Sequence, residues 1–261
     1  MPVRKKATKR PRRPIRTMLR KKPALAKMVK QIMNRNEETK IATNQYGFTS
    51  FNSGISSSGD LQVVLPSVTQ GVGQGNRVGS AITPIKLVIR GYVVYRCDTY
   101  QPAVMLGGRL FCFSDKTVSS YTVATSAGSN YNLLDVGGTS SSFTGSAIQF
   151  EYPHNNDQFK FYMDKKFKML KPWGYTNTLG TSATSAITSF NSTMYVPFKL
   201  TIPASKMPKM LKYDSTLSTS YPTNFAPFMA LGYCNLENYS ADVTPTQMAM
   251  EWCSTLYFKD A

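Results

Sequence analysis

The chain has 261 residues, and its hydrophobic content of 41% is sufficient for the core of one large β domain or two small domains. Its 31 Lys and Arg residues outnumber its 14 Asp and Glu residues and give a net charge of +17, which favours a polyanionic partner. No run of eighteen apolar residues occurs, and the N-terminus lacks the apolar segment of a signal peptide, so we expect neither membrane insertion nor secretion by that route.

The positive charge is concentrated at the N-terminus. Residues 1–35 contain fourteen Lys or Arg and no acid, whereas residues 36–261 contain seventeen basic and all fourteen acidic residues, a net of +3. A block of like charge repels itself until counter-charge arrives, so we expect residues 1–40 to form a largely disordered arm that binds nucleic acid. A solubilising tail is the plainer interpretation, but solubility alone does not require an acid-free block. The side chains expected to contact phosphates are Arg4, Lys5, Lys6, Lys9, Arg10, Arg12, Arg13, Arg16, Arg20, Lys21 and Lys22.

Two further features lie within the arm. The run "KRPRR" resembles a nuclear import signal and predicts an import receptor as a partner, with Lys9, Arg10, Arg12 and Arg13 as its centre. Residues 24–35 carry apolar side chains at helical spacing after Pro23, which predicts a short amphipathic helix. Its apolar face is more typical of a packing surface than of a membrane anchor, because the helix is short.

The glycine-rich segment "TQGVGQGNRVGSAITP" at 69–84 invites comparison with a phosphate-binding loop. A dinucleotide fingerprint requires glycine at its sixth position, where this chain has Asn76, and it requires a helix to follow. An alternating segment follows instead, with Ile85, Leu87, Ile89 and Val93 on one face. The glycines therefore predict a turn before a strand.

From residue 41 onward the sequence reads as strand and loop. About eight strands are expected, near residues 46–51, 62–65, 85–95, 104–113, 159–169, 194–202, 228–234 and 248–258. Small polar stretches such as "SGISSSG" and "VGGTSSSFTG" separate some of them and are expected at the surface. This pattern predicts an all-β domain over 41–261, a β-sandwich of two sheets with Greek-key connections, most specifically a single jelly roll.

Residues suited to catalysis or metal binding are few. The four cysteines contain no CxxC pair and lie in apolar segments, which predicts buried free thiols. The single histidine, His154, lies in a turn-like stretch, and Asp98, Asp115 and Asp135 occur singly near strand ends, where aspartate commonly caps turns. We therefore expect no catalytic residue, no metal and no cofactor.

Two stretches carry a family resemblance. Together with the basic arm, "QGVGQGNRVGSAITPIKLVIRG" and "FYMDKKFKML" resemble segments of the capsid proteins of circular, replication-initiator-encoding single-stranded DNA viruses, the circovirus-like CRESS-DNA group. The resemblance implies a virion protein that self-assembles as about sixty copies in the smallest (T=1) icosahedral shell, with its arms on single-stranded DNA. It also implies assembly in the host nucleus and a host cell-surface receptor. Capsid proteins of small RNA viruses share this layout, and a cellular nucleic-acid-binding β protein with a basic extension is a further alternative.

A second nucleic-acid-binding surface is predicted from strand alternation. The non-core face of the strand at 85–95 and its continuation carries Lys86, Arg90 and Arg96, together with Tyr92. The strand at 159–169 carries Lys160, Lys166 and Lys168, together with Tyr162. The resemblance implies that the two strands share a sheet, so we expect one basic face where phosphates bind and bases stack on tyrosines. A solvated or subunit-facing surface is the alternative, since charges are expected on any exposed strand face.

Overall fold

The computed structural model describes residues 28, 38–95, 105–121, 131–170, 195–214, 220–236 and 248–260. Contacts within the chain divide it into two units, Met1–Glu38 and Thr39–Ala261, and every strand that the structure describes lies in the second. The arm and the helix predicted at 24–35 lie outside the described residues, except for Met28, which has helical backbone and an exposed side chain. No helix in the described part of the chain is long and apolar enough to cross a membrane.

The eight predicted strands are all present. They are β1 (Lys40–Phe51), β2 (Gln62–Val63), β3 (Ala81–Tyr95), β4 (Met105–Asp115), β7 (Phe159–Leu170), β8 (Tyr195–Pro203), β10 (Pro227–Asn235) and β11 (Met248–Asp260). The sequence did not predict three short strands, β5 (Leu134–Val136), β6 (Thr139–Ser141) and β9 (Leu211–Lys212). It also did not predict the 3-10 helices η2 (Ser58–Asp60), η3 (Ala147–Phe150) and η5 (Ala204–Lys206).

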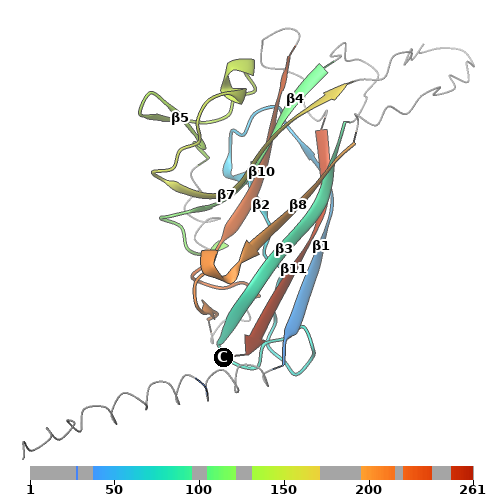
Figure 1. Cartoon of the computed structure of the whole chain (residues 1–261), viewed down its shortest axis with the longest axis vertical. Coiled ribbons are helices and arrows are strands. Elements are labelled where there is room, and N and C mark those ends of the chain that lie inside the picture. The colour runs from blue at the N-terminus through green and yellow to red at the C-terminus, as the bar shows by residue number, and fades with distance from the viewer. Residues whose placement is uncertain are drawn as a thin grey trace, which may run out of the picture. The chain divides into compact units, whose positions relative to one another are not determined.

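The long strands form two antiparallel sheets (Figure 1). Sheet A has the order β1-β11-β3-β8, with β9 also paired to β3, and sheet B has the order β2-β10-β4-β7. Within this order the first strand pairs with the last, β2 with β10, β3 with β8, and β4 with β7. Such nested pairing is the topology of a jelly roll, and the predicted all-β, two-sheet fold is confirmed.

The core is one continuous cluster to which both sheets contribute. Leu87, Ile89 and Val93 of β3 are fully buried, as are Leu110 of β4 and Met229 of β10. A fully buried aliphatic side chain of this size contributes roughly 1.5–3 kcal/mol to folding. The cluster therefore holds the two sheets together over the length of their strands.

Sheet A is buried on one face only, and β3 shows the alternation that the sequence predicts. One residue departs from it: Ile85, expected in the core, is only half-buried. The register of β3 against β11 shifts here, since Lys86 pairs with Tyr257 while Pro84 pairs with Phe258. Ile85 is the extra residue of a β-bulge, which reverses the alternation so that Ile82 and Leu87 both face the core.

The two inner strands of sheet B are buried on both faces, whereas its edge strand β7 has exposed lysines. All nine residues of β10 are buried, and so are most residues of β4. The chain between β4 and β7 contributes the cover: Phe143, in a serine-rich stretch predicted to lie at the surface, is fully buried with its ring 6.5 Å from that of Phe111. Gly232 of β10 lies beneath it, and a Cβ atom there would be 2.4 Å from the Phe143 ring. The absence of a side chain at Gly232 therefore leaves room for the Phe143 ring to pack against the strand.

A buried arginine secures this cover. Arg109 of β4 is 1% exposed, and its guanidinium donates two hydrogen bonds to the carboxylate of Asp164 on β7, at 2.9 and 2.7 Å. The remaining amino group donates to the backbone carbonyls of Gln149, Phe150 and Tyr152. A guanidinium has five N–H donors and an ammonium has three; the amino group that faces the three carbonyls has two N–H bonds, so one of these contacts shares a donor. Arg109 thus ties the covering segment to the sheet.

The glycine-rich segment is a turn that precedes a strand, as predicted. The backbone N–H of Gly71 donates to the carbonyl of Arg77, and the N–H of Arg77 donates to the carbonyl of Thr69, both at 2.9 Å. Arg77 is nearly fully buried, with its guanidinium 4.5 Å from the centre of the Tyr213 ring. Other hydrogen bonds join the segment to neighbouring parts of the domain, since the N–H of Val78 donates to the Asp260 carboxylate at 3.2 Å and the Lys40 ammonium donates to the carbonyl of Asn76 at 3.1 Å. The turn ends at Ser80, and β3 begins at Ala81.

Candidate nucleic-acid interface

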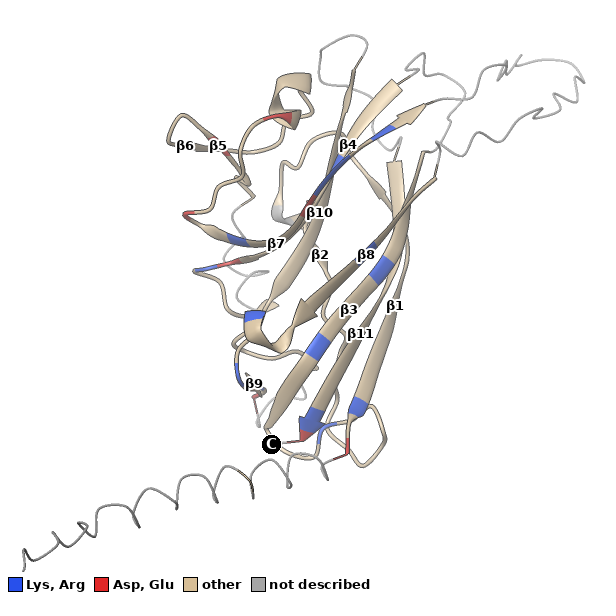
Figure 2. Cartoon of the chain, viewed as in Figure 1, with Lys and Arg blue, Asp and Glu red and all other residues tan. Residues whose placement is uncertain are grey.

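The basic side chains of the structure are distributed over both sheets (Figure 2). The eleven arm residues predicted to bind phosphates, the import signal among them, lie outside the described residues, and so does Arg96. Their contacts therefore remain predictions.

Lys86 and Arg90 lie on the outer face of sheet A with Tyr92, as the alternation predicts. The three residues follow the bulge at intervals of two or four, so their side chains share one face. The ammonium of Lys86 lies 4.4 Å from the centre of the Tyr257 ring, and Arg90 is exposed. This face is the open side of the sandwich.

The lysines of β7 do not share that face, and this prediction is wrong. β7 is an edge strand of sheet B, whereas β3 lies inside sheet A. The implied common sheet fails because β3 pairs with β8 and β7 pairs with β4.

The three lysines of β7 also do not share one face of their own strand. Cys112 pairs with Met163 and Phe113 with Phe161, which leaves Tyr162 as the extra residue of a bulge. Lys160 precedes the bulge and donates to the carbonyl of Lys206, at 2.8 Å. Lys166 and Lys168 follow it on the opposite face, where Lys166 forms an ion pair of 2.9 Å with Glu151. Strict alternation across residue 162 is the assumption that failed.

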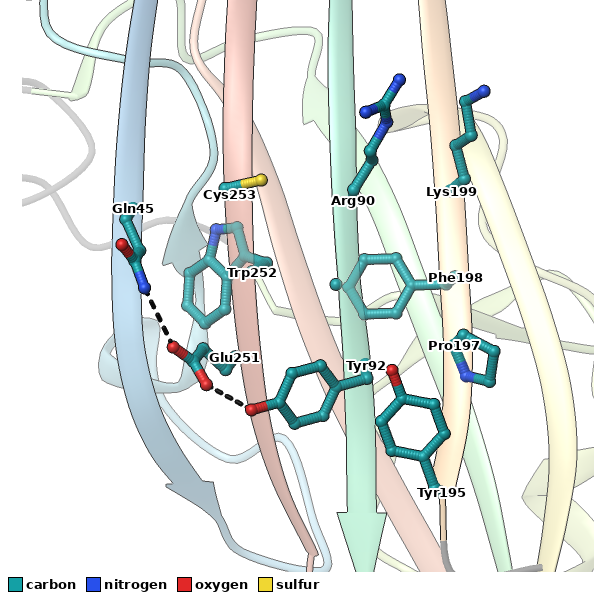
Figure 3. A pocket seen from close by; sticks show the side chains of 11 residues that line it. Gln45, Arg90, Tyr92, Tyr195, Pro197, Phe198, Lys199, Glu251, Trp252 and Cys253 are labelled. Carbon is teal, nitrogen blue, oxygen red and sulfur yellow. Dashed lines mark hydrogen bonds between the residues drawn. The ribbon is translucent and has the colours of Figure 1, made fainter. Parts of the chain in front are cut away.

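A groove of about 600 Å³ crosses the outer face of sheet A (Figure 3). Four strands contribute to its lining: Gln45 from β1, Glu251 and Cys253 from β11, Arg90 and Tyr92 from β3, and Tyr195, Pro197 and Lys199 from β8. Antiparallel pairing brings these residues together, since Tyr92 lies opposite Glu251 on one side and opposite Pro197 on the other. The groove is therefore built by rigid strands.

The aromatic part of the groove is a stacked pair of tyrosines. The Tyr92 and Tyr195 ring centres are 5.0 Å apart with an interplanar angle of 30°. Tyr92 donates a hydrogen bond to one carboxylate oxygen of Glu251, and the Gln45 amide donates to the other at 3.2 Å. This hydrogen bond raises the pKa of Tyr92 and lowers the pKa of Glu251 below its usual range. At neutral pH the phenol keeps its proton, and the carboxylate fixes the Tyr92 ring beside Tyr195.

The basic part of the groove is a pair of like charges. Arg90 and Lys199 are directly opposite each other in the β3–β8 register, and both are exposed. Within the described ranges neither forms an ion pair. Like charges in directly opposite positions destabilise a sheet unless an anion lies between them.

Reasoning from sequence identified Arg90 and Tyr92 but missed Tyr195, Lys199 and Glu251. The alternation of "MYVPFKLTI" was visible and assigns Tyr195 and Lys199 to the non-core face of their strand. Their position beside β3 was not visible, because it depends on pairing between segments more than a hundred residues apart.

The aspartates and the histidine singled out in the sequence analysis contact other protein groups where the structure describes them. Asp115 accepts hydrogen bonds from the backbone and hydroxyl of Thr117, and Asp135 accepts one from the N–H of Gly138, so both cap turns as predicted. Asp98 lies outside the described residues. His154 Nδ1 lies 3.5 Å from the Asp164 carboxylate. Among the described residues no cluster of side chains could hold a metal ion. Cys112 and Cys234 are buried thiols, as expected, whereas Cys253 is half-buried in the groove. The fourth cysteine, Cys97, lies outside the described residues.

Comparisons with known proteins leave the family open. No protein-family model and no curated protein matches the chain. It is similar to the solved chain "Structure of PNGF-II in P21 space group", with 11% identity and a TM-score of 0.34 over 85% of this chain, and it spans 35% of that chain's length. It is also similar to a chain of "Israeli acute paralysis virus heated to 63 degree - full particle", with 12% identity and a TM-score of 0.25 over 86% of this chain and 68% of that one. Both TM-scores are too low for either similarity to bear on function.

Proposed function

We propose that the protein is a viral capsid protein that self-assembles into a small icosahedral shell and packages a single-stranded DNA genome through its basic arm. The observation that carries the proposal is one chain joining an acid-free basic segment to a nested eight-stranded jelly roll. Viral capsid domains are among the proteins built on this fold. The two segments that resemble CRESS-DNA capsid proteins support the same assignment. On this proposal the protein acts in binding and assembly and has no catalytic residue.

The distribution of charge supports separate roles for the arm in binding nucleic acid and for the β domain in assembly. Residues 36–261 carry a net charge of only +3, so copies of the β domain can pack side by side without strong repulsion. About sixty arms with fourteen charges each would neutralise on the order of 800 phosphates. The arm is therefore the principal packaging element. Arg4, Lys5, Lys6, Lys9 and the basic residues that follow them would bind phosphates without reading sequence.

Packaging by the arm is tested by deleting residues 2–22, which removes eleven basic side chains and none of the described core. We expect purified particles of the variant to lose most of their nucleic acid, measured by the ratio of absorbance at 260 and 280 nm. Equal nucleic-acid content in both proteins would contradict this role for the arm. Nuclease digestion of the packaged material distinguishes DNA from RNA and so separates the proposal from an RNA-virus capsid.

Nuclear localisation is tested separately. The proposal assigns Lys9, Arg10, Arg12 and Arg13 to recognition by a host import receptor. Replacing the four residues with glutamine should leave a fluorescently tagged protein in the cytoplasm. Unchanged nuclear accumulation would remove this part of the proposal.

A further inference from the structure

We propose that the groove on the outer face of sheet A is a second site for single-stranded nucleic acid, where a base stacks on the Tyr92–Tyr195 pair and a backbone phosphate binds between Arg90 and Lys199. The inference rests on the proposed function, because it assigns an additional contact for the packaged strand. It concerns only residues of the β domain and is independent of how the arm binds.

The basic pair provides the first argument. Arg90 and Lys199 are opposite neighbours on two strands, and neither forms an ion pair within the described residues. Their mutual repulsion would be relieved by an anion that contacts both. A nucleic-acid phosphate has the charge and the several acceptor oxygens that a guanidinium and an ammonium require.

The tyrosine pair provides the second argument. Tyr195 is half exposed, and its ring already stacks on Tyr92 at 5.0 Å between centres. Stacking of bases on aromatic side chains beside a positively charged groove is the usual mode of sequence-tolerant single-strand binding. The Glu251 carboxylate holds Tyr92 through its hydroxyl, so the aromatic surface is fixed before a base arrives. The combination favours a strand of nucleic acid over an isolated phosphate.

The experiment uses the full chain and a short single-stranded oligonucleotide that carries iodouracil, which forms adducts with nearby aromatic side chains on irradiation. Adducts are located by mass spectrometry of the digested protein. We expect them on Tyr92 or Tyr195 as well as on arm peptides. The double variant Arg90→Gln/Lys199→Gln should reduce the yield in the groove about tenfold, since each lost phosphate contact weakens binding.

Two comparisons distinguish binding of nucleic acid in the groove from a general effect of the substitutions on the protein. Tyr195→Leu should reduce groove adducts on Tyr92 about tenfold, whereas Tyr195→Trp, which keeps a stacking surface, should restore them. The control variant Lys209→Gln/Lys212→Gln removes the same charge from exposed positions outside the groove and should leave the yield unchanged. Equal losses in Tyr195→Leu and Tyr195→Trp would overturn the stacking role.

Alkylation of Cys253 gives an independent readout, because its side chain lines the groove while Cys112 and Cys234 are buried. Oligonucleotide should slow alkylation of Cys253, followed by peptide mapping. Protection in particles free of nucleic acid would mean that a second copy of the chain covers the groove, and would overturn the inference. Adducts confined to arm peptides would also overturn it and leave the proposed function standing. A protein that neither assembles nor binds the oligonucleotide would overturn both.

Discussion

Among the described residues, sheet A is buried on one face and exposed on the other, whereas the inner strands β4 and β10 of sheet B are buried on both faces. The difference arises from one segment, the chain between β4 and β7, which places Phe143 and the carbonyls bonded to Arg109 over the outer face of sheet B. Each sheet has an arginine on an inner strand. Arg109 in sheet B makes five hydrogen bonds to protein groups, while Arg90 in sheet A is exposed. The comparison indicates that the inner strands of sheet B are enclosed within the protein, whereas the outer face of sheet A carries an exposed arginine in a groove.

The largest expected effect is the difference in stability between two variants in which one or the other of these arginines is replaced by methionine. Arg109→Met removes the donor to Asp164 and to three backbone carbonyls, two of them buried and one half-buried, so we expect a loss of about 3–5 kcal/mol in the free energy of unfolding. Arg90→Met removes an exposed charge and should change it by less than about 0.5 kcal/mol. Urea denaturation of the unassembled protein measures both. Similar losses in the two variants would show that the two arginines contribute equally to the stability of the fold.

A smaller effect is expected at two glycines. In Gly232→Ala the new methyl group would overlap the Phe143 ring, and overpacking of this kind costs about 1–3 kcal/mol. In Gly47→Ala, on β1 of sheet A, nothing lies within 4 Å of the added atom. This control should be nearly neutral in the same assay. A neutral Gly232→Ala would mean that the cover over sheet B shifts easily.

Tyr46, on the inner face of sheet A, should make the stability of the fold depend on pH in the alkaline range. Burial raises the pKa of Tyr46 from 10.0 to about 12, and its hydroxyl donates to the carbonyl of Leu65 at 2.8 Å. Because the folded-state pKa is raised, this contribution to stability is complete below about pH 10 and is lost as the pH rises through 12. We therefore expect the unfolding free energy of Tyr46→Phe to fall less steeply over this interval. An identical slope in both proteins would contradict the assignment.

The smallest effect is expected at the exposed ion pair between Lys166 and Glu151. Lys166 lowers the pKa of Glu151, mainly through their hydrogen bond. Lys166→Gln should therefore raise the Glu151 pKa toward its ordinary value in an NMR titration and leave the urea midpoint unchanged. A clear loss of stability would show that this ion pair helps to hold the segment between β4 and β7 against sheet B. We attribute that role to Arg109.

The sheets also differ in how far the sequence predicts them. Except at the bulge residue Ile85, alternation in β3 and β8 correctly predicts which residues face the core, because one face of sheet A is solvated. In β10 both faces are buried, so its sequence contains no alternation from which a face could be assigned. The chain between β4 and β7 folds back over sheet B, where it buries Phe143 and provides carbonyls for Arg109. Local sequence patterns do not predict contacts of this kind.

The candidate site shows the same limit. Arg90 and Tyr92 were found from the pattern of a single strand, whereas Lys199 and Tyr195 became part of the site only through the pairing of β3 with β8. The bulge at Tyr162 separates Lys160 from Lys166 and Lys168, and inserting one residue into a strand leaves little trace in the hydrophobic pattern. Strand order and bulges are therefore the features that the sequence alone did not provide.

Electron microscopy of the purified full-length protein, with nucleic acid present, tests the central claim most directly. A capsid protein with a jelly-roll domain and a basic arm should form closed spherical particles of one size, because symmetric contacts between copies close the shell. We expect such particles, with nucleic acid inside them. A monodisperse monomer at high protein concentration, bound to nucleic acid or free of it, would contradict the claim.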